Sequence, residues 1–175
     1  MRKTCYLPSG LVVLGNVALS PAFAQTIVQN WTGVTRQMIN GLGEDLAPPD
    51  TMGAVGPNHV VQLTNGACIV YDKVGNVVSS AITDAHFWQN AGINSTVTNA
   101  GISDPHIMYD PSSGRWFASE INVSSTGNQM MVARSNSSDP TAGWKAVNFR
   151  ANVGFGDYPA LSVDGNSVYI SVNNF

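Results

Sequence analysis

Charged residues are scarce in this chain of 175 residues, where they make up 11% of the sequence and form no basic cluster. Proteins that bind nucleic acid neutralise phosphates with clustered Lys and Arg side chains, so the sequence predicts no nucleic-acid partner. Gly, Asn, Ser, Thr and Val are abundant instead. This composition favours a globular protein rich in strands and turns, and it argues against helical bundles and disordered chains.

Long apolar runs are also missing. The one run near the N-terminus is about half of the roughly 20 residues that a membrane-spanning helix needs. It follows a basic start and precedes a small-x-small sequence, which together indicate a secretion signal in residues 1–24 with cleavage between Ala24 and Gln25. We therefore expect a secreted or periplasmic protein without a membrane span.

Cysteine occurs only twice, and Cys5 lies within the predicted signal. Cys68 is then alone, so no disulfide within the chain is expected. It lies in an apolar, strand-like run, which favours a small buried hydrophobe over a reactive nucleophile. The three histidines lack the spacing of zinc ligands.

A repeat organises the remaining sequence. Three segments begin at Asp50, Asp104 and Asp157, which are 54 and 53 residues apart, and each continues into short strands. In the clearest copy, residues 104–109 and 115–120 are two strands joined by a turn rich in Asp, Pro, Ser and Gly. A period of this length with strand-turn-strand content indicates the four-stranded antiparallel blades of a β-propeller.

The expected fold is therefore all-β, a partial β-propeller of about two and a half blades with a ~53-residue repeat. Residues 25–49 are expected to form an N-terminal strand and a linker. The blades are expected at residues 50–103, 104–156 and a truncated 157–175. Open sheet edges are pairing hazards, so this division predicts a fragment of a longer protein or protomers that complete one another. Missing blades or self-association would cover the edges.

One turn between the outer strands of the second blade resembles the Asp-box of sialidases, Ser-x-Asp-x-Gly-x-Thr-Trp. Ser137, Asp139 and Trp144 match this pattern, whereas Thr141 and Gly143 have exchanged places. In such a turn the Asp caps backbone N–H groups and the Trp packs beneath the loop. The expected role of these residues is structural.

The motifs together resemble a group of secreted bacterial β-propeller proteins that are often described as sialidase-like or uncharacterised. They are residues 48–62; residues 104–111 with 114–117; residues 138–141 with Trp144; and residues 157–159 with 169–171 and Asn173. The resemblance covers about residues 48–175. It implies an exported propeller of about six or seven blades.

The recurring Asp50, Asp104 and Asp157 are the candidate ligand-binding residues. Blade symmetry would bring them to one face near the axis, where carboxylates can bind Ca²⁺ or cationic groups. Alternatively, each Asp accepts hydrogen bonds from the backbone of a neighbouring blade and locks the blades together. His106, two residues from Asp104, is a candidate general base if its ring faces a channel.

Two functions follow from these observations, and the sequence leaves both open. The first is an exported module that binds a carbohydrate, a protein or a cation, because the repeat carries no complete catalytic set. The second is a sialidase-like glycoside hydrolase whose site is completed by blades outside this chain. Its candidate carboxylates are Asp104, Glu120 and Asp157. A sialidase also needs an arginine cluster, and the arginines are scattered along the sequence.

Overall fold

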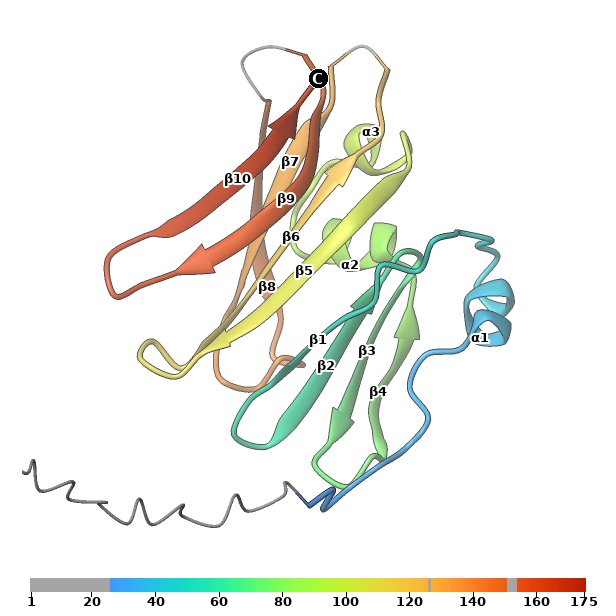
Figure 1. Ribbon diagram of the computed structural model, residues 1–175, viewed down its shortest axis with the longest axis vertical. Helices are drawn as coiled ribbons and strands as arrows, with labels where there is room; N and C mark the ends of the chain where they lie inside the picture. The colour runs from blue at the N-terminus through green and yellow to red at the C-terminus, as the bar shows by residue number, and fades with distance from the viewer. Residues whose placement is uncertain (1–25, 126, 151–153) are drawn as a thin grey trace, which may run out of the picture.

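The structure is a computed structural model that describes residues 26–125, 127–150 and 154–175. The predicted signal, with its cleavage site at Ala24 and Gln25, lies outside these residues. Within them, the strands form three antiparallel sheets, arranged as in Figure 1. The expectation of a β-rich chain built from antiparallel sheets is confirmed. No sheet closes on itself in the described part of the chain, so the propeller stays a prediction.

Sheet 1 has four strands in chain order: β1 (Met52–Val55), β2 (His59–Thr64), β3 (Ala67–Asp72) and β4 (Val77–Ile82). In β2 the apolar residues alternate, and Val61 and Leu63 are fully buried on the face that meets the second sheet. Strand β3 is buried along nearly its whole length, because both of its faces are covered.

Sheet 2 repeats this plan with β5 (Ile102–Asp110), β6 (Arg115–Asn122), β7 (Gln129–Ser135) and β8 (Trp144–Arg150). The turn between β5 and β6 forms as expected, since Gly114 has a φ of +63° and its N–H donates to the Asp110 carbonyl. Sheet 3 is a hairpin of β9 (Gly156–Val163) and β10 (Val168–Asn174). The first strands of the three sheets lie side by side, β1 against β5 and β5 against β9.

The N-terminal segment differs from the expectation. The strand predicted within residues 25–49 does not form, because residues 26–35 pair with no sheet neighbour. This segment instead covers the outer face of sheet 1, where the Trp31 ring packs against Tyr71 at a centroid distance of 5.9 Å. Gly75, with a φ of +92°, leaves the space for that ring, since a Cβ there would lie 2.7 Å from Trp31.

Three short helices complete the fold: α1 (Arg36–Gly41), α2 (Asp84–Asn90) and α3 (Ser95–Thr98). Helix α1 lies in the predicted linker, and the Thr35 hydroxyl caps it by accepting from the Met38 N–H. Helices α2 and α3 connect sheet 1 to sheet 2. In the described residues, none of these helices has the length and apolar character required to cross a bilayer.

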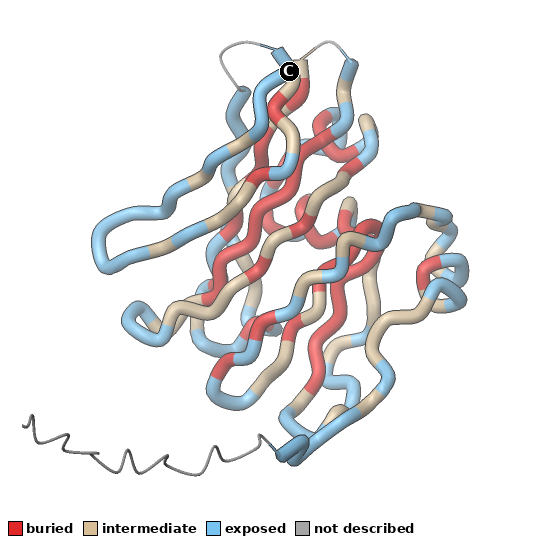
Figure 2. The backbone as a smooth tube through the Cα atoms, in the orientation of Figure 1, coloured by how far each residue is buried: buried red, intermediate tan, exposed pale blue. Residues whose placement is uncertain are grey.

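The main core lies between sheets 1 and 2, as the buried segments in Figure 2 show. Trp88 from α2 and Trp116 from β6 are fully buried there. The opposite face of sheet 2 is only partly covered, because sheet 3 supplies two strands against four. Val147 and Phe149 on β8 remain 64% and 42% exposed.

Candidate functional site

The repeat positions gather at one end of the sheets, near the starts of β1, β5 and β9; we call this the strand-start end. Asp50, Asp104 and Tyr158 all have positive φ there, of 39°, 61° and 53°. The third equivalent residue is therefore Tyr158, so an alignment of the repeat on Asp157 is off by one residue. Asp adopts this left-handed conformation more readily than Tyr, so Tyr158 is held there at a cost of roughly 1 kcal/mol or more.

A chain of hydrogen bonds connects the three sheets at this end. The Asn65 Nδ2 donates to Asp50 Oδ2 at 2.8 Å, and its Oδ1 accepts from the Asp104 N–H at 3.0 Å. Asp104 Oδ2 in turn accepts from the Tyr158 N–H at 3.2 Å, while its Oδ1 accepts from the Ser103 hydroxyl. Asp104 thus accepts from the backbone of the next sheet, as in the structural alternative raised from the sequence, whereas Asp50 accepts from the Asn65 side chain within its own sheet.

The repeat position in sheet 2 that is equivalent to Asn65 also makes a hydrogen bond between sheets. Ser119 lies 54 residues after Asn65, and its buried hydroxyl donates to the Pro159 carbonyl at 2.8 Å. The sequence analysis did not single out Asn65. Aligning the repeat on the positive-φ residues identifies it, so the missing information was backbone conformation.

Asp157 and His106 flank this hydrogen-bonded row. Partial burial raises the pKa of the Asp157 carboxyl, and the nearby Asp104 carboxylate raises it further. The His106 ring stands edge-on against the Tyr158 ring, with centroids 4.8 Å apart and an interplanar angle of 80°. Burial lowers the pKa of His106, so its imidazole is neutral at pH 7. Its buried Nδ1 has no hydrogen-bond partner among the described residues.

The three repeat aspartates do not converge on one point. In the part of the chain that the structure describes, no group of three or more His, Cys, Asp or Glu side chains is placed to hold a metal ion. Asp104 and Asp157 approach each other, whereas the Asn65 amide separates Asp104 from Asp50. The strand-start end therefore presents a carboxylate pair next to an aromatic ring.

A second pair of carboxyl groups, Glu120 and Asp84, is buried in the core, and no sequence motif predicted it. Glu120 is fully buried, and its Oε2 accepts a hydrogen bond from the Trp88 Nε1. Burial raises its pKa well above the ordinary value, and the Asp84 carboxyl raises it further. Glu120 Oε1 has no hydrogen-bond partner in the described structure. A carboxyl enclosed in this way cannot contact a substrate, so Glu120 is a poor catalytic candidate.

Asp84 contributes differently to this cluster. Its carboxylate accepts from the backbone N–H groups of Gly66 and Ala85, both at 2.7 Å. Burial nevertheless raises its pKa to about 6. The neighbouring Cys68 thiol is buried, and its pKa is also raised, chiefly by burial and then by the charges of the two carboxyl groups. The thiol is therefore protonated and packs as a small hydrophobe.

The turn that resembles an Asp-box makes structural contacts. Asp139 Oδ1 accepts from the Thr141 N–H at 2.9 Å, and Ser137 Oγ accepts from the Asp139 N–H at 3.1 Å. The Trp144 Nε1 donates to the Pro140 carbonyl at 2.8 Å. The Trp144 ring then packs edge-on against Phe87 in the core, so the turn anchors β8 to helix α2.

Comparison of the chain with the known protein families, with curated proteins and with solved structures found no match.

Proposed function

We propose that the three sheets are successive blades of a β-propeller and that the protein is an exported carbohydrate-binding module. The strand-start end is its ligand face. Three features support the propeller: the 54-residue spacing of the positive-φ positions, the four-stranded meander of sheets 1 and 2, and the side-by-side placement of β1, β5 and β9.

The observation that carries the carbohydrate proposal is the exposed ring of Tyr158. It is 46% exposed, and His106 holds it edge-on. An aromatic face can stack on the apolar C–H face of a sugar, while carboxylate oxygens accept hydrogen bonds from sugar hydroxyls. Asp104 and Asp157 supply such oxygens beside the ring. A cation could bind the carboxylate pair, but it would gain less than a sugar from contact with the aromatic ring.

Glycan-array screening followed by calorimetry of the full chain tests this proposal. Tyr158→Ala is expected to weaken binding of the selected glycan at least tenfold, since stacking on an aromatic ring is lost. Tyr169→Ala is the matched control, because Tyr169 is 51% exposed but lies on β10. Equal loss in both variants would reject the ligand face. Heat on titration with Ca²⁺ alone, lost in Asp157→Asn, would reassign the site to a cation.

The glycoside hydrolase is the second candidate, and the raised pKa of Asp157 is the observation that favours it. A glycosidase acid needs a raised pKa, and its partner carboxylate would be Asp104. Hydrolysis of fluorogenic sialosides or other glycosides, abolished by Asp157→Asn, would establish this activity. Absence of turnover with a glycan that the protein binds would leave the binding module.

We also propose that additional strands, from further blades or from a second copy of the chain, cover the exposed face of β7 and β8. The exposed Val147 and Phe149 on β8 support this proposal, as does the free edge of β10. Such a face next to an open sheet edge favours association through added strands.

A further inference from the structure

Three cationic side chains lie in a row at the end of sheet 2 opposite the strand-start end; we call this the turn end. Arg134 on β7 pairs with Phe117 on β6 and with Lys145 on β8, so these residues share one face of the sheet. Arg115, two residues before Phe117 on β6, projects from the same face. The row holds three of the six Lys and Arg residues in the described part of an acidic chain. Strand pairing therefore brings together three cationic residues that are far apart in the sequence.

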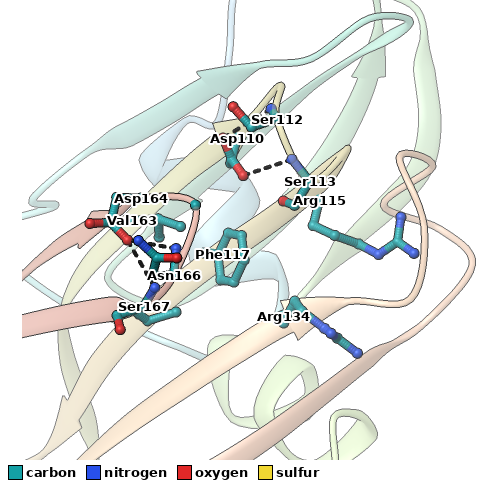
Figure 3. A pocket seen from close by; sticks show the side chains of 12 residues that line it. Asp110, Ser112, Ser113, Arg115, Phe117, Arg134, Val163, Asp164, Asn166 and Ser167 are labelled. Atoms are coloured by element: carbon teal, nitrogen blue, oxygen red, sulfur yellow. Dashed lines mark hydrogen bonds between the residues drawn. The ribbon is translucent and has the colours of Figure 1, made fainter.

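A cleft of about 520 Å³ opens beside two of these cations. The β5–β6 turn and the β9–β10 turn form its sides, and Phe117 lies at its centre (Figure 3). In this view the side chains of Arg115 and Arg134 lie on one side of Phe117, and the turn that carries Asp164 lies on the other. The cleft therefore has a basic wall, formed by Arg115 and Arg134 on β6 and β7, and an acidic, hydroxyl-rich wall made of the two turns. Asp110 lies on the turn beside Arg115, and Asp164 lies across the cleft.

The two guanidinium groups have donor capacity to spare. Arg115 Nη1 donates to the Gly114 carbonyl at 3.1 Å, and neither Arg115 nor Arg134 forms an ion pair with any described carboxylate. A guanidinium carries five N–H donors in a planar fork that fits carboxylate and sulfate oxygens. The basic wall can therefore hold an anionic group.

The acidic wall is committed to its own turns but keeps acceptor capacity. Asp110 accepts from the N–H groups of Ser112 and Ser113. Asp164 accepts from the N–H groups of Asn166 and Ser167 and from the Tyr169 hydroxyl. These bonds lower the pKa of both carboxyl groups, so both are ionised at neutral pH. An ionised carboxylate has about four lone-pair sites, and the remaining ones accept from ligand hydroxyls.

We propose that this cleft binds an acidic sugar, with its carboxylate or sulfate on Arg115 and Arg134 and its hydroxyls directed to Asp110 and Asp164. A simple anion would use only the guanidinium groups and would meet repulsion from Asp110 beside them and from Asp164 across the cleft. A neutral sugar would leave the guanidinium groups unused. A ring that carries both an anionic group and several hydroxyls satisfies both walls. This inference does not rest on the proposed function, because the cleft and Tyr158 lie at opposite ends of the sheets.

Titration of the full chain with trigalacturonate tests the inference, with maltotriose as the neutral sugar and acetate as the simple anion, all at equal ionic strength. Amide shifts in an NMR spectrum report the location of binding. We expect trigalacturonate to shift the amides of Phe117, Arg134 and Asn166, and we expect maltotriose and acetate to leave them in place. Arg115→Gln and Arg134→Gln are each expected to weaken binding roughly tenfold or more, since each removes charge-assisted hydrogen bonds.

Arg150→Gln is the matched control, because it removes the same charge from the opposite face of β8. Should Arg115→Gln lower the melting temperature, the exposed Arg134→Gln alone provides the readout. The site is overturned if trigalacturonate does not bind, or if Arg150→Gln weakens it as much as Arg134→Gln does. The sugar is overturned if acetate binds as tightly as trigalacturonate. Tyr158→Ala should leave this binding unchanged, which separates it from the ligand face.

Discussion

Glu120 is a carboxyl that is fully buried in the core. A carboxyl that is buried without a cation resists ionisation, and only the Trp88 indole N–H favours its charged form. In the unfolded chain the same group ionises near pH 4.3. The native protein therefore holds a proton that the unfolded chain releases. Stability falls as pH rises above that value, and it continues to fall until the raised folded pKa is passed.

We predict that Glu120→Gln stabilises the protein at pH 7 by about 2 kcal/mol, because the amide keeps an acceptor for Trp88 and carries no titrating proton. At pH 4, where the carboxyl is protonated in both states, the gain should disappear. Urea unfolding at the two pH values measures both quantities. Glu44→Gln, outside the core, is the control and should change stability little at either pH. A gain of equal size at both pH values would contradict this account.

In the Glu120→Gln variant, the effect of Asp84 on stability can be measured without the titration of Glu120. The pKa of Asp84 is raised to about 6, so its contribution falls as pH rises from about 4 to about 6 and is constant above that range. Asp110 and Asp164 act with the opposite sign, since their pKa values are lowered. They add stability above an unfolded pKa near 3.9 and lose it at lower pH. The two effects therefore occupy different pH windows.

At the scale of the elements, Asn65 joins sheet 1 to sheet 2. It donates to the Pro48 carbonyl and to Asp50, and it accepts from the Asp104 N–H. We predict that Asn65→Ala destabilises the protein by about 2–3 kcal/mol, since the buried Asn65 side chain makes three hydrogen bonds that its partly buried or exposed partners lose. Chemical denaturation measures this loss. Asn99→Ala, at an exposed helix end, should cost far less, and similar losses in both would argue against an inter-sheet role.

The strands were predictable because their signals are local. Alternation of apolar residues in β2 and the Asp-Pro-Ser-Ser-Gly turn before β6 each specify a strand or a turn within a few residues. The segment around Trp31 was not predictable in this way. Its apolar residues suit a strand, but its Trp31 ring packs instead against Tyr71 and Gly75, which are distant in sequence. Tertiary packing decided its conformation.

The candidate site was likewise predictable only in part from the sequence. Asp50 and Asp104 were identified from the repeat and His106 from its closeness to Asp104, and all three lie at one end of the sheets. Tyr158 was missed, because its equivalence to Asp104 appears only in the backbone angle. The basic row was missed for another reason: strand pairing alone brings Arg115 and Arg134 together, and no spacing in the sequence encodes that pairing.

At the scale of the whole molecule, we expect the uncovered face of β8 to promote association between copies of the chain. We predict that the full chain forms assemblies larger than 18.5 kDa, and that the double substitution Val147→Asp and Phe149→Asp reduces their mass. Light scattering after size exclusion measures it. Val74→Asp is the control, because Val74 is 60% exposed at the far turn of sheet 1. A wild-type mass equal to one chain, with or without the substitutions, would refute the prediction.

Hydrogen bonds link sheet 1 to sheet 2 and sheet 2 to sheet 3, in the order of the chain. Asn65 in sheet 1 receives the N–H of Asp104 in sheet 2, and Ser119 in sheet 2 reaches the carbonyl of Pro159 in sheet 3. Each sheet thus depends on its successor to satisfy a polar side chain. Native-state hydrogen exchange should record this dependence as a gradient, with the β9–β10 hairpin opening first and sheet 1 last. We expect this order because loss of sheet 3 would leave the Ser119 hydroxyl without the Pro159 carbonyl, and loss of sheet 2 would leave Asn65 Oδ1 without the Asp104 N–H.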